Sequence, residues 1–228
     1  MHRTLARIAS IRLQADGSSL AKITCPPQAI PASGQFSLAF RPGDEAPLRS
    51  ALFPIGLEPN GFTTAAEQAW QPGGVLDLLG PVGRGFRPPS QARRWALAGI
   101  GRPLDRLLPL LQQGLKGGAN IAVWSTLPAV ALPAQVEIVR DEADALAWAD
   151  YIAFDVSPES LVGLGDRLNQ ALGSAPSASI QVLVAPAMPC GLGLCQACAI
   201  AGHRGGKLAC RDGPVFDWPV IGGTGKSA

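Results

Sequence analysis

Short apolar runs alternate with turn-forming residues over the first ninety positions. Runs such as "SLAKITC", "GQFSLAF" and "VLDLLG" have the length and alternation of β-strands, and turns such as "ADGS", "RPGDEAP" and "QPGG" separate them. The pattern predicts strands over 5–14, 19–25, 34–40, 49–57 and 75–80. Strands this short and closely spaced are typical of a small antiparallel β-barrel or sandwich. The Pro-rich stretch "FRPPSQARR" then marks a domain boundary near residue 90.

From Trp95 onward the pattern changes to apolar strands that alternate with helical stretches. We expect strands over 95–101, 120–125, 134–140, 150–156 and 177–186, and helices over 103–118 and 157–174. Ser157 stands before Pro-Glu at the start of the second helix, where its hydroxyl is a suitable N-cap. This alternation predicts an α/β domain with a parallel sheet.

Composition and charge exclude several classes of protein. The chain has 228 residues, 47% of them hydrophobic, so it can bury real cores without disulfides. A formal charge of +2, with scattered arginines, gives no reason to expect a nucleic-acid partner. No apolar run reaches membrane-spanning length, and the N-terminus lacks the apolar region of a secretory signal. We therefore expect a cytoplasmic protein that does not bind membranes.

Four of the five cysteines lie within the last forty residues. Cys190, Cys195, Cys198 and Cys210 follow the pattern C-x4-C-x2-C-x11-C. Four thiolates with this spacing can complete the two iron sites of a 2Fe-2S cluster. A structural zinc site with four cysteines is the competing interpretation, although only one C-x2-C pair is present. The third interpretation is that these thiols bind no metal. Cys25 stands apart and is expected to be a small buried hydrophobe.

The cysteine segment also carries a family resemblance. "MPCGLGLCQACAI" and the tail "KLACRDGPVFDWPVI" resemble the cluster-binding segment of the electron transfer subunit of class 1B dihydroorotate dehydrogenase, in the ferredoxin-NADP reductase-like superfamily. "VLDLLGPVGRGF" is similar to the end of that family's flavin barrel. The resemblance implies a flavin-binding-like β-barrel over 1–90, a nucleotide-binding-like α/β domain over 91–180 and a 2Fe-2S segment over 181–228.

The resemblance also implies where cofactors would bind. The strand that holds FAD in the family corresponds to "LRSALFPIG", so it implies Arg49 and Ser50 as FAD residues, without the family's glycine-threonine phosphate loop. The nicotinamide turn corresponds to "AGIGRP", with Gly99 and Gly101. A third glycine is missing, and "DVSPES" replaces the family's Cys-Gly-Pro turn, which argues against NAD binding.

The leading hypothesis is an iron-sulfur electron-transfer subunit, an oxidoreductase component with no catalytic residue of its own for a substrate. It would relay electrons between a nicotinamide/FAD site and a partner flavoprotein, and the resemblance implies a dihydroorotate dehydrogenase-like catalytic subunit of pyrimidine biosynthesis in a hetero-oligomer. One alternative is a divergent 2Fe-2S protein that has lost FAD and NAD and serves another redox complex. The other is a structural four-cysteine zinc module.

Overall fold

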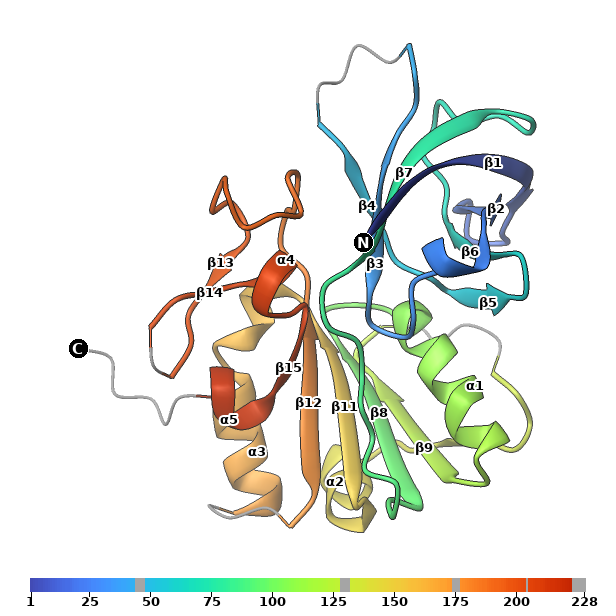
Figure 1. The fold of residues 1–228 in the computed structure, drawn as a ribbon. Coiled ribbons are helices and arrows are strands. Elements are labelled where there is room, and N and C mark those ends of the chain that lie inside the picture. The colour runs from blue at the N-terminus through green and yellow to red at the C-terminus, as the bar shows by residue number, and fades with distance from the viewer. Residues whose placement is uncertain (44–47, 128–131, 174–176, 204, 223–228) are drawn as a thin grey trace.

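The N-terminal part of the chain is one antiparallel sheet that curls into a half-barrel (Figure 1). This computed structural model describes residues 1–43, 48–127, 132–173, 177–203 and 205–222. The strands are β1 (His2–Leu13), β2 (Ser19–Thr24), β3 (Phe36–Phe40), β4 (Ser50–Leu52), β5 (Gly56–Glu58), β6 (Gly61–Ala65) and β7 (Val75–Val82). They pair in the order β4-β3-β7-β1-β2-β6-β5, each pair antiparallel.

The two faces of the half-barrel have different roles. Side chains alternate along a strand, and Leu76 and Leu78 of β7 point inward into a core shared with Ile8, Ile23 and Phe62. The outward-facing positions of β3 and β7 instead pack against the rest of the molecule, where Leu38 belongs to the second core and Leu79 packs against it. The half-barrel therefore presents its outer face to the C-terminal part of the chain.

The second sheet has the strand order of a dinucleotide-binding domain. Its strands are β8 (Arg94–Ile100), β9 (Asn120–Ser125), β10 (Glu137–Ile138), β11 (Tyr151–Val156), β12 (Ser179–Val184) and β15 (Val215–Asp217). The order is β10-β9-β8-β11-β12-β15, with only β15 antiparallel. The order reverses between β8 and β11, so the turns that follow these strands lie at the switch point where such sheets bind ligands. Together, the two sheets confirm the expected fold.

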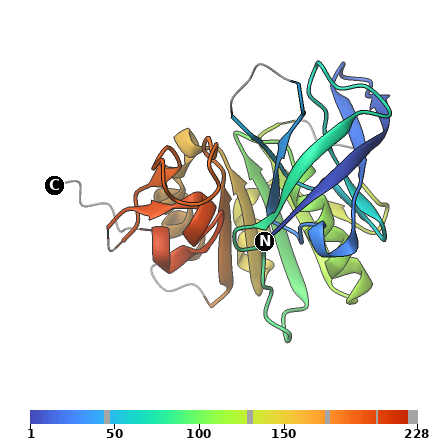
Figure 2. The same cartoon turned by 45° about the horizontal axis from the view of Figure 1, so that its top comes forward.

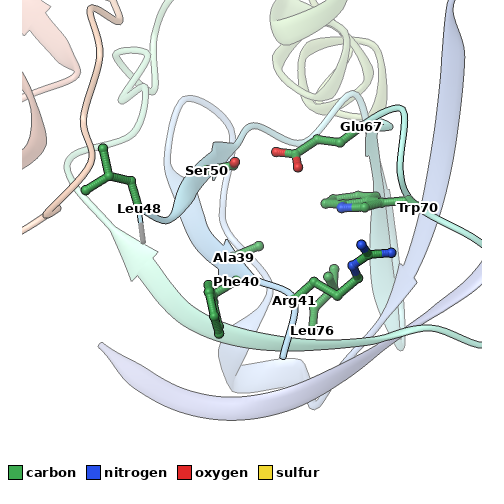
Figure 3. Close-up of a pocket in the computed structure, with 8 residues that line it drawn as sticks. All are labelled: Ala39, Phe40, Arg41, Leu48, Ser50, Glu67, Trp70 and Leu76. Carbon is green, nitrogen blue, oxygen red and sulfur yellow. The ribbon is translucent and has the colours of Figure 1, made fainter. Parts of the chain in front are cut away.

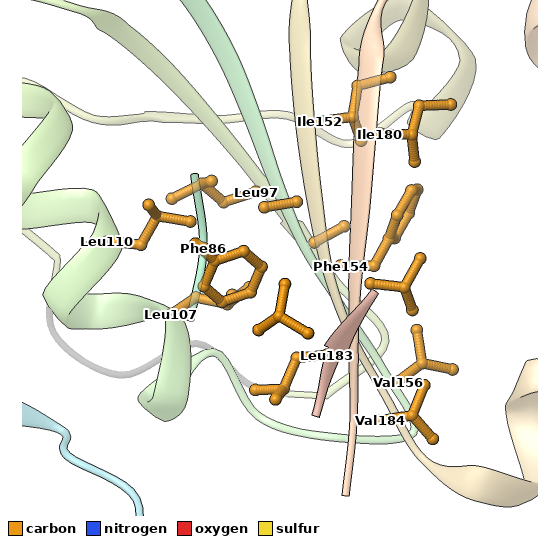
Figure 4. Packing of buried hydrophobic residues seen from close by; sticks show 14 of the residues in the cluster. Phe86, Leu97, Leu107, Leu110, Ile152, Phe154, Val156, Ile180, Leu183 and Val184 are labelled. Atoms are coloured by element: carbon orange, nitrogen blue, oxygen red, sulfur yellow. The ribbon is translucent and has the colours of Figure 1, made fainter. Parts of the chain in front are cut away.

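Helices cover both faces of this sheet. Helix α1 (Leu108–Lys116) lies on one face, and α2 (Glu142–Trp148) and α3 (Leu164–Leu172) lie together on the other (Figure 1). Between them the buried faces of β8, β11 and β12 form a continuous apolar layer (Figure 4). Among the described residues, none of the helices is long and apolar enough to cross a membrane.

Several elements differ from the sequence-based expectation. The helix predicted from residue 103 begins as a 3-10 turn at Asp105–Leu107 and becomes α-helical only at Leu108, where Pro109 suits the first turn. The Ser157 hydroxyl accepts a hydrogen bond from the Ser160 amide at 3.2 Å, but it caps a 3-10 turn, Pro158–Leu161, rather than the predicted helix. The α-helix begins only at Leu164 and has no side-chain cap. The strand predicted over 134–140 shortens to β10. Helix α2, capped by Asp141, and strand β6 were not predicted.

The C-terminal segment leaves the sheet at β12 and returns to it as β15. Between these strands it forms a two-stranded sheet, β13 (Ala199–Ile200) and β14 (Lys207–Leu208), and the short helix α4 (Ala209–Asp212). A last turn of helix, α5 (Trp218–Ile221), follows β15. We call the segment between β12 and β15, residues 185–214, the excursion. It lies beside both the half-barrel and the α/β domain (Figures 1 and 2). The amide of Arg84, just after β7, donates a hydrogen bond to the carbonyl oxygen of Gly213 at 2.5 Å. This hydrogen bond joins the barrel to the C-terminal segment.

Candidate metal centre and interdomain cavity

The excursion between β12 and β15 brings the four predicted cysteines together as two pairs. Cys190 and Cys195 place their sulfurs 3.3 Å apart, and Cys198 and Cys210 place theirs 3.2 Å apart. Cys195 is exposed and Cys190 half-buried, whereas Cys198 and Cys210 are buried. One pair therefore faces solvent and the other faces the protein interior.

The loop that carries the first pair is shaped by glycines. Gly191 and Gly193 have φ values of +63° and +75°, which lie in the left-handed region that residues with a Cβ rarely adopt. A Cβ at Gly191 would also clash with Leu38 of β3, so the loop packs directly on the outer face of the half-barrel. The Leu192 amide turns back toward Cys190 Sγ at 3.5 Å. The loop therefore turns backbone amides toward the sulfur of Cys190.

The environments of the thiols differ strongly. Backbone amides of Cys195 and Leu192 lower the pKa of the Cys190 thiol to about 6, so the thiolate already predominates near neutral pH. Burial, with Cys198 as its close neighbour, raises the pKa of the Cys210 thiol to about 12. Because metals bind thiolates, a metal at the inner pair must displace a proton from a thiol whose pKa is raised.

The pairing fits two metal ions better than one. Each pair of sulfurs is close enough for both to bind the same ion, and a 2Fe-2S cluster takes two cysteines on each iron. A zinc site needs all four thiolates around one ion. The residues therefore fit the cluster.

The predicted FAD residues lie on the half-barrel, but on different faces. Arg49, just before β4, donates to the Asp77 carbonyl oxygen at 2.8 Å and to Asp77 Oδ2 at 3.1 Å on the outer face. Arg3 of β1 reaches the same carboxylate. Ser50 points the other way, toward a small pocket of about 30 Å³ that Glu67 also lines (Figure 3). The structure does not bring Arg49 and Ser50 onto one surface.

We predict that Asp77→Asn lowers the free energy of unfolding by about 1.5 kcal/mol at pH 7, since Asp77 is buried and accepts charge-assisted hydrogen bonds. Arg3 and Arg49 lower the pKa of Asp77, so this stabilisation is complete above the unfolded value near 4 and is lost as the pH falls below it. Urea unfolding from pH 7 to pH 3 measures the difference. Arg3→Ala should change stability little, because that side chain is mostly exposed. An equal deficit at pH 3 and pH 7 would contradict the prediction.

A larger cavity, of about 340 Å³, lies between the half-barrel and the α/β domain. Residues 51–53, 55 and 64–67 line it from the barrel, and residues 102, 103, 105 and 106 line it from the turn after β8. We call it the interdomain cavity. It lies at the carboxyl end of β8, beside the switch point of the sheet, and its volume is in the range of small-molecule sites.

Arg106 connects the two domains at the edge of the interdomain cavity. Its guanidinium is bidentate on Asp155, with Nε donating to Oδ2 at 2.7 Å, and its carbon Cζ lies 4.8 Å from the centre of the Phe53 ring. Asp155 is fully buried at the end of β11, and burial raises its pKa while Arg106 opposes the rise. The sequence indicated Asp155 only as a departure from the family pattern. An acid after an apolar strand was the available signal, but nothing pointed to Arg106.

Neighbouring residues already occupy the space around the predicted nicotinamide turn. The Gly101 amide donates to Thr126 Oγ1 at 2.9 Å, and a Cβ at Gly101 would lie within 3 Å of the hydroxyls of Ser157 and Ser160. At Gly99 a Cβ would lie 2.5 Å from the Arg102 carbonyl oxygen. The glycines allow this tight packing, and Gly101 has no amide left for a pyrophosphate. The turn does not fit NAD as the family pattern would bind it.

Comparison with known proteins agrees with the site and the fold. Residues 186–220 match the family model of the iron-sulfur cluster binding domain of dihydroorotate dehydrogenase B, which includes all four paired cysteines. This bears out the resemblance seen in the cysteine segment. No curated protein sequence is significantly similar to the chain.

Solved structures share the fold over most of the chain. An NADH-dependent reduced ferredoxin-NADP oxidoreductase, described for flavin-based electron bifurcation, has a TM-score of 0.71 at 19% identity, covering 96% of this chain and 90% of that one. The ferredoxin reductase of carbazole 1,9a-dioxygenase has a TM-score of 0.61 at 15% identity, covering 78% and 68%. Phthalate dioxygenase reductase has a TM-score of 0.57 at 12% identity, covering 83% and 70%. The fold is that of ferredoxin reductases.

Proposed function

We propose that this chain is an iron-sulfur electron-transfer subunit that passes single electrons between a flavin and a partner flavoprotein. The observation that carries the proposal is the arrangement of four thiols as two pairs between β12 and β15, within the segment matched by the cluster-binding family. Cys190, Cys195, Cys198 and Cys210 would hold a 2Fe-2S cluster, which supplies one-electron transfer when bound. The chain's own residues shape the loop, bury one pair of ligands and leave the other near the surface.

FAD is the proposed second cofactor, with its ring system in the interdomain cavity. The cavity is lined by Ala51, Leu52 and Phe53 of the strand on which the family resemblance predicts FAD binding, and its volume suits a flat ring. Arg49 and Ser50 precede these residues and stay predicted contacts to the rest of FAD. Arg49 can bind a phosphate only by giving up Asp77, and we therefore propose weak FAD binding.

The decisive experiment is chemical analysis of the protein purified without oxygen. We expect iron and acid-labile sulfide in equal amounts, a visible spectrum of a 2Fe-2S protein and a rhombic paramagnetic signal after reduction. Flavin analysis of the same sample separates a cluster-and-FAD subunit from a cluster-only protein. Stoichiometric zinc without sulfide would overturn the proposal in favour of a structural module.

The match of residues 186–220 to the cluster-binding domain of dihydroorotate dehydrogenase B implies a partner catalytic subunit. We propose that this partner is a flavoprotein of the dihydroorotate dehydrogenase type, in a cytoplasmic hetero-oligomer that serves pyrimidine biosynthesis. The supporting features are the exposed leucines of the cluster loop, since Leu192 is 47% and Leu194 77% exposed beside Cys195. Apolar side chains around a redox centre suit a surface that must approach another centre closely. A reducing compartment would keep the four thiols available.

We predict that Leu194→Asp weakens binding of the partner flavoprotein at least tenfold while the cluster is retained. A charge placed in the apolar part of an interface stays unpaired on binding, and that typically costs more than 1.4 kcal/mol. Co-expression with the catalytic subunit, followed by co-purification and flavin analysis, measures the loss. Ile138→Asp is the matched control, because Ile138 is 65% exposed on β10 at the far edge of the sheet. If both variants bind equally well, docking through this loop is wrong.

A further inference from the structure

Two pieces of the excursion carry the two pairs of cysteines, and Arg211 lies where these pieces touch. Gly193 belongs to the loop between Cys190 and Cys195, which form the pair that faces solvent. Helix α4 carries Cys210 of the interior pair, and Arg211 follows it directly. A Cβ at Gly193 would lie 3.4 Å from Arg211 Cδ and 3.5 Å from Arg211 Cβ. The aliphatic stem of Arg211 therefore packs against the loop of the other pair.

The charged end of Arg211 is held beside the interior pair. Its Nε donates to Asp212 Oδ1 at 3.1 Å and its Nη2 donates to Asp212 Oδ2 at 3.3 Å. The Leu208 amide donates to the same carboxylate at 2.9 Å, which ties Asp212 to the start of α4. The hydrogen bond and charge of Asp212, followed by the charges of Cys210 and Cys198, raise the pKa of Arg211. The guanidinium is therefore within electrostatic range of both interior sulfurs.

We propose that the positive charge of Arg211 raises the reduction potential of the 2Fe-2S cluster that the four cysteines hold. The inference rests on the proposed function, which places the cluster there. Reduction adds one electron to the site while no proton or protein bond changes, so the total charge becomes more negative by one. A cation fixed beside the ligands stabilises this more negative state. Asp212, the anion of the same ion pair, acts in the opposite direction.

A redox titration of the anaerobically purified protein, followed by visible absorbance, tests this role without any activity measurement. Arg211→Gln keeps the stem carbons that pack against Gly193 and removes the charge. We expect the equilibrium constant for reduction to fall about two- to tenfold, where tenfold corresponds to about 59 mV for one electron. Arg211→Lys keeps both stem and charge and should stay close to the parent. Asp212→Asn, which keeps an acceptor oxygen for the Leu208 amide, should raise the potential.

Salt separates an effect of charge from a change of structure. The side chain of Arg211 is 63% exposed, and the Debye length falls from about 30 Å at 0.01 M salt to about 3 Å at 1 M. The shifts of both charge-removing variants should therefore shrink in 1 M salt, whereas the effect of a loosened loop would persist. Arg94→Gln is the matched control, because Arg94 is 51% exposed, faces Asp150 and lies at the start of β8, away from the excursion. It should leave the potential unchanged.

Two results would overturn the inference. One is an unchanged or raised potential in Arg211→Gln that contains iron and sulfide. The other is a shift of Arg211→Gln and Asp212→Asn in the same direction, which would indicate a structural effect. If Arg211→Gln loses its cluster, Asp212→Asn still decides, because the inference requires a rise in its potential. Parent protein without iron and sulfide would overturn the proposed function and this inference with it, so the two failures are distinguishable.

Discussion

Cys198→Ala is expected to remove nearly all bound iron and sulfide from the protein. Cys198 is fully buried and its sulfur lies 3.2 Å from Cys210, so the substitution leaves one of the two proposed iron sites with a single protein thiolate. An iron in a 2Fe-2S cluster needs two such ligands in addition to the bridging sulfides. Iron analysis and the visible spectrum of anaerobically purified protein measure the loss, which should approach the complete absence of a cluster.

Cys25→Ala provides the matched control for this loss. Cys25 is also a buried thiol, but it belongs to the half-barrel core, and burial raises its pKa to about 11. Its replacement should leave iron and sulfide unchanged. If Cys198→Ala retained the full cluster spectrum, the assignment of ligands would be wrong, whereas equal iron loss in both variants would indicate a general effect on folding.

Arg106→Leu is expected to destabilise the protein by about 3–5 kcal/mol. The substitution leaves the carboxylate of Asp155 fully buried without its cation, and removing one partner of a buried ion pair typically has a cost of this size. It also removes the contact of the guanidinium with Phe53, which joins the α/β domain to the half-barrel. Chemical denaturation followed by tryptophan fluorescence measures the change.

The deficit of Arg106→Leu should depend on pH in a defined direction. Burial raises the pKa of Asp155 above its unfolded value, and without Arg106 only the more weakly acting charge of Arg102 opposes the rise. A carboxyl with a raised pKa takes up a proton on folding, so the unfolding free energy increases as the pH falls through that raised pKa toward about 4. The double variant Arg106→Leu/Asp155→Leu should recover much of the loss at pH 7. If the double variant is as unstable as the sum of the single ones, the ion pair is not the cause.

The cysteine site was predictable because its information is local. The spacing of Cys190, Cys195 and Cys198, with Gly191 and Gly193 between them, already specifies a loop that can turn around a cluster. The strands were predictable where apolar runs were long, as in β8, β9 and β11. The sequence also indicated correctly that a barrel precedes an α/β domain.

Contacts between distant parts of the chain could not be predicted. Arg49 looked available for a phosphate, but it lies across from Asp77, twenty-eight positions later, and pairs with it. Arg106 and Asp155 meet only because β8 and β11 are neighbours in the sheet. The turn at Gly101 resembled a nucleotide loop, and only the fold shows that Ser157 and Ser160 lie over it. A single sequence contains the residues of these contacts but not their pairing.

The cluster-bearing excursion begins and ends on two adjacent strands. It leaves at the end of β12, returns at the start of β15, and is closed at its base by a hydrogen bond from the Val184 amide to the Pro214 carbonyl oxygen at 2.9 Å. A segment with this topology behaves as an exchangeable module, since a short hairpin turn could join the same two strands without changing their register. It can likewise open as a local unit in hydrogen exchange while the five parallel strands stay protected. Because the excursion also packs on the half-barrel through Gly191, it could be transplanted only onto an α/β sheet that is accompanied by a similar barrel face.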